Sequence, residues 1–454
     1  MESESLRITV PYGHTSLKVE LPQDRVVFSG EFEELPALDD FESTLLARLE
    51  RPTAGKPLRE IAASRSSALI LVDDNTRQTP VAHILPVLFD HLNEIGLADD
   101  RIEILTASGT HRLMTEQELR DKVGEEARRR VAITQHDCRD CDSIVELEPV
   151  HTGRSAIPVQ INRRVLDADL IIGLGSIVPH SDAGFTGGAK IVQPGVCGTA
   201  TTAATHIAAA LLDEIPLGDA ENPCRLGMEE VARTVGLDFI INVVQDHRGR
   251  VLEIVTGDLV AAHRRGADIS RRAHGIAISA PADIVVVGSY PGDIDWWQAE
   301  KCLVAAYFAV RQGGLVIFAG PCYEGLVHNH PGLRDWLKPS FREARAMASD
   351  IDPADAHADL IAADVAIVNA KVREKATILM VTEGLPNDDV ELLGYQRMPD
   401  LQAAVTRALQ LDPQGTIGVL PYGGLCLPYV VSAPRPSPDV QPRLRLARRG
   451  GGGE

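Results

Sequence analysis

The sequence predicts an α/β fold of two domains, each built on a largely parallel sheet. Apolar runs of strand length alternate with amphipathic stretches of helical period along most of the 454 residues. That alternation is typical of buried parallel strands connected by helices. It is interrupted once, where a basic stretch over 263–272 is followed by Pro281, and it then restarts.

The individual elements follow from local patterns. Residues 7–21 alternate apolar and polar side chains around Gly13, which predicts a β-hairpin. Eight apolar runs predict strands, over 68–73, 102–106, 170–174, 239–244, 284–288, 315–319, 377–381 and 417–420. Amphipathic stretches between them predict helices, among them 80–95, 115–123 and 400–409.

The interruption of this pattern sets the expected domain boundary. We expect a first α/β domain over 1–275 and a second over 276–432. The remaining segment, 433–454, is rich in Pro, Arg and Gly and ends in a glycine run. Such a composition buries too little apolar surface to offset the loss of chain entropy, so we expect a disordered tail.

Composition and charge exclude several classes of function. Acidic residues outnumber basic ones by 64 to 45, a net charge of −19, which argues against nucleic-acid or anionic-membrane partners. The start lacks the features of a signal peptide, and the apolar runs fall far short of the ~20 residues of a membrane span. Seven thinly spread cysteines do not form a disulfide framework. We therefore expect a cytoplasmic protein.

Polar residues follow the first two predicted strands, where open α/β sheets bind ligands. Asp74, Thr76 and Arg77 come directly after 68–73, and an arginine there can bind a carboxylate or phosphate through two parallel hydrogen bonds. The alternative is a helix start, with Thr79 as the cap and the proline after it at the first helical position. Both interpretations can hold at once.

The second of these strands is followed by a glycine turn and a histidine. Gly109 permits an unusual backbone conformation, and His111 stands two residues after it. The alternative interpretation is an ordinary surface-loop histidine. A lone Cys138-x-x-Cys141 pair lies further along, but the sequence offers no second pair nearby, so a structural zinc site is not favoured.

Residues 175–190 are the most informative segment. Gly187 and Gly188 allow a backbone to approach an anion closely, although the segment is neither a Walker A loop nor a Gly-x-Gly-x-x-Gly fingerprint. Lys190 is followed by two apolar residues, and a desolvated lysine can act as a nucleophile or covalent anchor. The alternative is a lysine that pairs with phosphate or faces solvent.

Two more candidates lie on predicted helices. His206 has only threonine and alanine one turn away on either side, which leaves room for a metal or cofactor, or else for a tightly packed neighbouring helix. Gln298 and Lys301 are three residues apart, so a helix would place both on one face, where they could clamp a carboxylate. The alternative is a solvated first turn.

Together these separated elements resemble the lactate racemase family, whose members carry a nickel-pincer nucleotide. The matching residues are Asp74, Thr76 and Arg77; Gly109, His111 and Arg112; His180, Lys190 and His206; and Gln298 with Lys301. They occur in the family's order, and the resemblance extends over most of the chain, roughly 7–429. Coincidental agreement at so many spaced positions is not expected.

The resemblance implies a cofactor and residues that hold it. The cofactor would be pyridinium-3-thioamide-5-thiocarboxylic acid mononucleotide carrying Ni(II), joined to Lys190 as a thioamide. Two sulfurs and a ring carbon would bind the nickel, with His206 as its fourth ligand, a donor set suited to this ion. Gly187 and Gly188 would approach the nucleotide phosphate. Cofactor biosynthesis proteins would be partners in maturation.

The resemblance also implies an activity, with an active site in the cleft. The protein would be an isomerase, a racemase or epimerase that inverts C2 of a 2-hydroxy acid by reversible hydride transfer. His111 and His180 would act as acid and base, and the second domain would close over the substrate, whose binding residues would be Asp74, Thr76, Arg77, Trp297, Gln298 and Lys301. Trp297 stands where lactate racemase has a tyrosine, so a substrate other than lactate is expected.

Two other classes of function compete with this one. A nicotinamide-dependent 2-hydroxyacid dehydrogenase is disfavoured because no Gly-x-Gly-x-x-Gly follows an early strand. A non-catalytic homologue that only binds nickel or cofactor is disfavoured because His111, His180, Lys190 and His206 are all present. Loss of either base histidine would have favoured that class.

Overall fold

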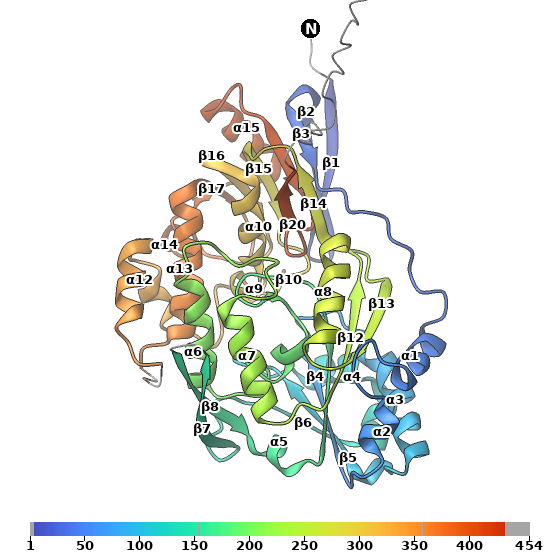
Figure 1. Cartoon of the computed structure of the whole chain (residues 1–454). Coiled ribbons are helices and arrows are strands. Elements are labelled where there is room, and N and C mark those ends of the chain that lie inside the picture. The colour runs from blue at the N-terminus through green and yellow to red at the C-terminus, as the bar shows by residue number, and fades with distance from the viewer. Residues whose placement is uncertain (1–3, 153–154, 354, 356, 432–454) are drawn as a thin grey trace, which may run out of the picture.

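The chain is built on two six-stranded sheets, each covered by helices, and this confirms the predicted α/β class (Figure 1). The structure is a computed structural model, and it describes residues 4–152, 155–353, 355 and 357–431. The predicted tail, 433–454, lies outside the described residues. No helix among the described residues is long and apolar enough to cross a membrane.

The first sheet is formed by residues 68–257 in the order β13-β12-β9-β4-β5-β6. Its strands are β4 (Ala68–Asp73), β5 (Ile102–Ala107), β6 (Ala132–Gln135), β9 (Leu170–Ser176), β12 (Phe239–Gln245) and β13 (Val251–Gly257). All pair in parallel except β13, which runs antiparallel to β12. Alternate residues of β4 enter different cores, Ile70 on one face and Leu71 on the other. Burial on both faces explains why these strands are continuous apolar runs.

Helices and short hairpins surround this sheet. The helices are α1 (Phe41–Glu50), α2 (Leu58–Ala62), α3 (Val81–Ile95), α4 (Glu116–Arg130), α5 (Arg163–Asp167), α6 (Thr199–Ala210), α7 (Pro223–Thr234) and α8 (Ala261–His274), with 3-10 turns at Asp99–Arg101 and Gly188–Ile191. Two hairpins accompany them, β7 (Ile144–Thr152) with β8 (Ser155–Asn162), and β10 (Pro179–His180) with β11 (Gly184–Phe185).

The second sheet has the order β18-β17-β16-β15-β19-β3, and all its pairs are parallel. Its strands are β3 (Val26–Ser29), β15 (Ala282–Gly288), β16 (Val310–Ala319), β17 (Ala376–Val381), β18 (Gln396–Arg397) and β19 (Ile417–Leu420). The helices are α9 (Trp296–Ala299), α10 (Lys301–Ala309), α11 (Leu333–Trp336), α12 (Phe341–Ser349), α13 (Leu360–Lys375), α14 (Asn387–Leu392) and α15 (Leu401–Leu411). A separate parallel pair joins β14 (Gly275–Ile278) to β20 (Leu427–Val430).

The N-terminal strands lie with the second sheet, although the predicted boundary placed them in the first domain. The predicted hairpin forms as β1 (Ser5–Tyr12) and β2 (Thr15–Pro22), and its apolar side chains pack into a core shared with β15 and β19. After a 3-10 turn at Gln23–Arg25, β3 adds to the edge of the sheet beside β19. The chain then runs along the outside of the molecule to α1 (Figure 1). The division at 275/276 stays a proposal.

The topology explains where a ligand can bind. In the first sheet β4 lies between β5 and β9, so successive crossovers leave in opposite directions and open a crevice beyond the strand ends. Val72 is level with Thr106 of β5 and Leu174 of β9, so the three following loops start at one height. In the second sheet β15 lies between β16 and β19 in the same way.

All eight predicted strands and the three predicted helices are present. The interpretation of Thr79 as a helix cap is wrong. The residue before α3 is Pro80, and no side chain caps the helix. The hydroxyl of Thr79 instead donates a hydrogen bond to Asp73 Oδ2, because both side chains are buried and a buried carboxylate needs a donor.

Candidate active site

The loops after the strands of both sheets line one cavity that opens to solvent. Ten of the twelve residues predicted for the site line it: Asp74, Thr76, Arg77, His111, His180, Gly187, Lys190, His206, Trp297 and Lys301. Gln298 lines two smaller adjoining pockets, and Gly188 is buried beside the cavity. Segments up to 227 residues apart therefore meet at the predicted place, between the two sheets.

Asp74 and His111 form the first unit of the site. His111 Nδ1 lies 2.6 Å from Asp74 Oδ2, and because a carboxylate only accepts, Nδ1 carries the proton. The other carboxylate oxygen of Asp74 accepts from the backbone and hydroxyl of Thr76. Burial opposes the charge of Asp74, but His111 and Arg77 outweigh burial and hold its pKa well below the ordinary value. The pair therefore contains an ionised carboxylate.

A hydrogen-bonded chain joins this pair to the second half of the molecule. Lys301 Nζ donates to Gln298 Oε1, so the amide nitrogen of Gln298 faces the other way. That nitrogen lies 3.1 Å from His111 Nε2. Since an amide nitrogen only donates, His111 Nε2 accepts this hydrogen bond through its lone pair. The predicted proximity of Gln298 and Lys301 is thus confirmed.

His180 is held in a different way. It is the last residue of β10, and the backbone N–H groups of Asp182 and Ala183 in the following turn point at its Nδ1 at 3.2 and 3.5 Å. Nδ1 therefore accepts, which places the ring proton on Nε2. Burial, followed by the charges of Lys190 and Lys301, lowers the pKa of His180 well below its ordinary value. Asp182 Oδ2 is 3.5 Å from Nδ1.

The two glycines before Lys190 shape the turn that presents it. Gly187 and Gly188 have φ angles of +74° and +57°, and a Cβ on Gly187 would come within 2.8 Å of Ile177. Only glycine fits both conditions. The Gly188 N–H donates to Asn242 Oδ1 at 2.8 Å, so this group is already used within the protein. The predicted contact of these glycines with a nucleotide phosphate stays a prediction.

Lys190 reaches the cavity from a 3-10 turn (Gly188–Ile191). Burial is the largest cause that lowers its pKa to about 8, and the nearby charge of Arg77 acts in the same direction. Near neutral pH the lysine therefore has an appreciable fraction of uncharged amine, the form that reacts as a nucleophile. This is the property expected of a covalent anchor.

His206 has the state expected of a metal ligand. Its Nδ1 donates to the Thr202 carbonyl at 2.9 Å, which leaves a lone pair on Nε2. Burial, the largest cause, lowers its pKa to about 4, so the ring is neutral. A backbone carbonyl at the far nitrogen is a common way to orient a ligating imidazole. Ala203 and Ala210 on the same helix pack into one core with α13, which confirms the tightly packed neighbouring helix, whereas the role of His206 as a metal ligand stays a prediction.

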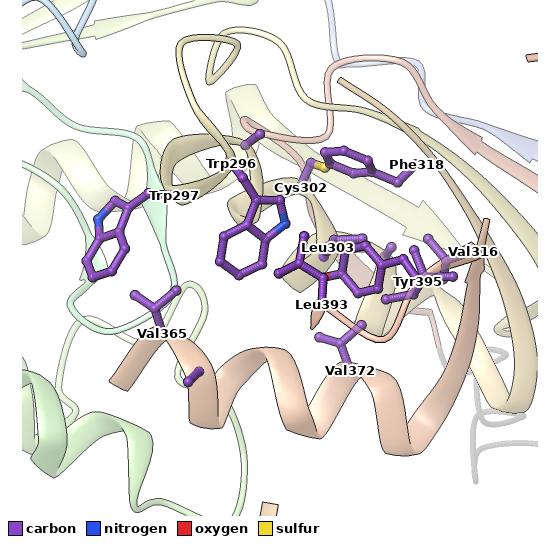
Figure 2. Packing of buried hydrophobic residues seen from close by; sticks show 14 of the residues in the cluster. Trp296, Trp297, Cys302, Leu303, Val316, Phe318, Val365, Val372, Leu393 and Tyr395 are labelled. Carbon is purple, nitrogen blue, oxygen red and sulfur yellow. The ribbon is translucent and has the colours of Figure 1, made fainter. Parts of the chain in front are cut away.

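Trp297 borders the cavity, whereas its neighbour Trp296 belongs to the interior. Figure 2 shows Trp296 among Cys302 and Leu303, with Trp297 set apart from it. The Trp297 indole stacks on His330, with ring centroids 4.5 Å apart and planes inclined by 8°. His330 in turn contacts Asp359 at 2.8 Å and Thr110 at 3.2 Å. The imidazole on which the indole stacks is therefore held by contacts from both halves.

Sequence reasoning missed several residues of the cavity, in particular the carboxyl groups of Asp182, Glu300 and Asp364. Burial raises the pKa values of Glu300 and Asp364. Asp364 interrupts an apolar stripe of α13 at residues 361, 365 and 368. That interruption was visible as a signal, because a carboxyl in the apolar stripe of a buried helix requires an explanation. Asp182 was visible through its place two residues after His180.

The residues present fit the implied cofactor. Lys190 offers a reactive amine and His206 a neutral imidazole, and both line the same cavity. Among the described residues, no group of three or more His, Cys, Asp or Glu side chains is arranged to hold a metal ion. A single protein imidazole is also the donor that the resemblance implies.

Comparisons of the sequence with known proteins point to one family. The model of the lactate racemase N-terminal domain matches residues 12–215, and that of the lactate racemase C-terminal domain matches residues 277–425. Lactate racemase of Thermoanaerobacterium thermosaccharolyticum is 30% identical over 339 residues, 73% of this chain and 78% of that protein. Lactate racemase of Lactiplantibacillus plantarum is 33% identical over 302 residues, 65% of this chain and 70% of that protein.

Comparisons of the structure agree. The lactate racemase apoprotein of Thermoanaerobacterium thermosaccharolyticum superposes with a TM-score of 0.82 at 27% identity, covering 93% of this chain and 100% of that one. A Thermotoga maritima protein that is 21% identical shares the fold, with a TM-score of 0.67 over 87% of this chain and 100% of that one. The two domain matches and the relatives at 30% identity or above establish that this chain belongs to the lactate racemase family.

Proposed function

We propose that the protein is a racemase or epimerase that inverts C2 of a 2-hydroxy acid with the help of a nickel-pincer nucleotide. Its family supports racemase function. The observation that carries the proposal is the convergence on one cavity of His111, His180, Lys190 and His206. Lys190 would hold the nucleotide covalently, and His206 would be the protein ligand of its nickel. When bound, the group supplies a hydride acceptor and donor.

His111 is suited to take the proton of the substrate hydroxyl. Its Nε2 has a lone pair, and the present partner of that atom, the Gln298 amide, would give way to the substrate oxygen. Asp74 at Nδ1 fixes the ring and stabilises the imidazolium that forms when the proton arrives. His111 can therefore gain and return a proton without moving.

His180 is suited to the opposite face because its resting form differs. Its Nε2 carries the ring proton, and burial together with nearby cations favours the uncharged ring. To act as a base, the ring must carry its proton on Nδ1 instead. After a small rotation, Asp182 Oδ2, which lies 3.5 Å away, would accept a hydrogen bond from that Nδ1–H. Inversion needs one base on each face, so each histidine gains a proton when the other loses one.

The substrate carboxylate would bind to the cations of the cavity. Arg77 already donates to the Thr76 hydroxyl at 2.9 Å, which fixes the guanidinium, and Lys301 is fixed by Gln298. Burial, with Arg77 as the next cause, lowers the pKa of Lys301. A bound carboxylate would supply the missing counter-charge and restore the ammonium form. Gln298 would link carboxylate binding to the placement of His111.

The test begins with the intact mass of the chain, co-expressed with the cofactor biosynthesis proteins and supplied with nickel. We expect a nucleotide-sized adduct that maps to Lys190 and is absent from Lys190→Arg. The loaded protein should interconvert C2 stereoisomers of a 2-hydroxy acid, followed by chiral chromatography. Deuterium placed at C2 should remain in the product in water, as hydride transfer requires.

Two further results would decide the case. His206→Ala should keep the Lys190 adduct but lose nickel, measured as metal per adduct by mass spectrometry. An unmodified wild-type mass, from a host whose machinery modifies a known acceptor, would remove the covalent anchor. Loss of the C2 deuterium to solvent would contradict hydride transfer and point to proton abstraction from carbon.

A further inference from the structure

A stripe of α13 forms one wall of the cavity and contains a single carboxyl group. Ile361, Asp364, Val365 and Val368 line the cavity at the spacing of one helical face. Asp364 is 2% exposed, and its Oδ1 has no hydrogen-bond partner in the described part of the chain. Buried carboxyl oxygens without a donor are rare, because the group loses its hydration and gains nothing in return.

The neighbouring charges do not satisfy this group. Lys371, on the same helix, uses its ammonium group for the carbonyls of Ala210 and Leu212. The other carboxyls of the cavity wall, Asp182 and Glu300, raise the pKa of Asp364 by repulsion in addition to its burial. Asp364 therefore borders the cavity with an oxygen that no described residue satisfies, and a ligand in the cavity can supply the partner.

The charges of the cavity limit what that ligand can be. Asp73 is paired with Lys122 at 2.6 Å and Asp74 with His111. The remaining ionisable groups of the cavity wall are three carboxyl groups and three basic groups: Asp182, Glu300 and Asp364, and Arg77, Lys190 and Lys301. In the proposed function Lys190 loses its charge to the covalent tether, and Arg77 and Lys301 bind the substrate carboxylate. Among the described residues that line the cavity, no cation then remains for a second carboxylate on the substrate.

From this we infer that the substrate is a 2-hydroxy acid with at least one further hydroxyl group beyond C2, and that Asp364 binds this hydroxyl. The inference rests on the proposed function. A hydroxyl can donate to the carboxyl oxygen or accept from the protonated carboxyl, so it suits either state. Ile361, Val365 and Val368 would contact the C–H groups between the hydroxyls.

The competing side chains fit less well. A second carboxylate would face three carboxyl groups. An alkyl or aryl chain would leave Asp364 without a partner, which costs roughly 10- to 100-fold in affinity. A site built around a polar group discriminates strongly against the analogue that lacks it.

The experiment compares a polyhydroxy acid with an alkyl acid of equal chain length, and both with a shorter dicarboxylate, on the loaded enzyme. We would measure kcat/KM for C2 inversion of a six-carbon aldonate, of 2-hydroxyhexanoate, and of malate as the dicarboxylate. The aldonate should exceed the other two by at least about tenfold. Asp364→Leu should reduce the aldonate value by roughly 10- to 100-fold and leave 2-hydroxyhexanoate equal or better. Asp364→Asn, which keeps a hydrogen-bonding group, should fall between.

A matched control separates this effect from a general loss of packing. Asp389 is a buried aspartate outside the cavity, bonded to Arg334, and Asp389→Asn should leave the substrate preference unchanged. Equal rates with the aldonate and 2-hydroxyhexanoate, or a preference for malate, would overturn the inference. A parallel loss with both acids in Asp364→Leu would do the same.

A binding measurement distinguishes failure of this inference from failure of the proposed function. Titration calorimetry of the purified chain should show tighter binding of the aldonate than of 2-hydroxyhexanoate, and Asp364→Leu should remove the difference. Inversion without a hydroxyl preference would leave the proposed function standing and remove the inference. Selective binding that depends on Asp364, without inversion of any acid, would do the reverse.

Discussion

The two histidines of the site lie in segments of opposite character. His111 follows β5 in a loop whose contacts reach across the cleft, and 27% of its side chain is exposed. His180 is the last residue of β10, only 6% of its side chain is exposed, and its ring accepts from the backbone N–H groups of Asp182 and Ala183. One ring is thus positioned by distant side chains and the other by local chain geometry.

The difference shows how the surroundings of a histidine decide which ring nitrogen carries the proton. A carboxylate at Nδ1 places the lone pair of His111 on Nε2, whereas backbone N–H groups at Nδ1 place a proton on Nε2 of His180. The first arrangement also depends on both halves. Besides the Gln298 contact, Asn329 and His330 of the second half bond to Thr110, next to His111. Contacts across the cleft therefore position His111, whereas the hydrogen bonds to the His180 ring come from within the first half.

Removing each ring tests most directly whether both histidines exchange protons with the substrate. His111→Ala and His180→Ala should each reduce kcat for inversion by about 10²- to 10⁴-fold, because both faces need a base. The Lys190 adduct should form in both variants. Chiral chromatography and intact mass measure the two outcomes. Wild-type activity in either variant would mean that the ring in question does not exchange protons with the substrate.

We expect the two carboxylates beside the histidine rings, Asp74 and Asp182, to differ in their effect on kcat. Asp74→Asn replaces an acceptor at 2.6 Å with an amide that can disturb the tautomer, and we expect a loss of about 10²-fold or more in kcat. Asp182 is 3.5 Å away and shares its role with backbone donors, so Asp182→Asn should cost less than about tenfold. Pre-steady-state rates with the loaded enzyme would measure both. A reversed order would contradict the contrast between the two segments.

The lowered pKa of His180 has a consequence for stability. The pKa of His180 in the folded chain lies below the unfolded value near 6.5. As the pH falls, the ring therefore binds a proton in the unfolded chain but not in the folded chain. Stability is therefore complete above pH ~6.5 and falls as the pH decreases below it, by at most about tenfold in the unfolding equilibrium per pH unit. Denaturant unfolding of the apo chain should show a shallower acid loss for His180→Gln. An unchanged pH slope would mean that the ring is not buried as described.

The contacts across the cleft should have the smallest effect. Arg112 bonds to Glu118 in its own half and to Glu324 in the other, and such partly exposed pairs contribute little. Glu324→Gln should raise KM by only about two- to fivefold and leave kcat nearly unchanged. Glu118→Gln, which stays within one half, is the matched control for KM. Equal changes in both variants would show that the pair does not act in closure.

Eight of the twelve strands in the two sheets, the fold class and most residues of the candidate site could be predicted from the sequence. Strands such as β4 and β9 are buried on both faces, so each is an almost continuous apolar run. Such a run can be recognised in the sequence without knowing which strands pair with it. The chemistry-bearing residues follow those strands directly, because ligands bind beyond the carboxyl ends of parallel strands. The cavity therefore contains ten of the twelve residues that the sequence predicted.

Only the tertiary structure decided which distant groups meet. The periodicity of α13 shows that Asp364 shares a face with Val365, but not that this face borders the cavity. In the same way, the pattern of β3 does not reveal that it pairs with β19, almost 400 residues later. The physical reason is that the pattern of apolar residues within a segment indicates whether that segment is buried, independently of the rest of the chain. Pairing, protonation and the lack of a partner depend on what the rest of the chain places opposite.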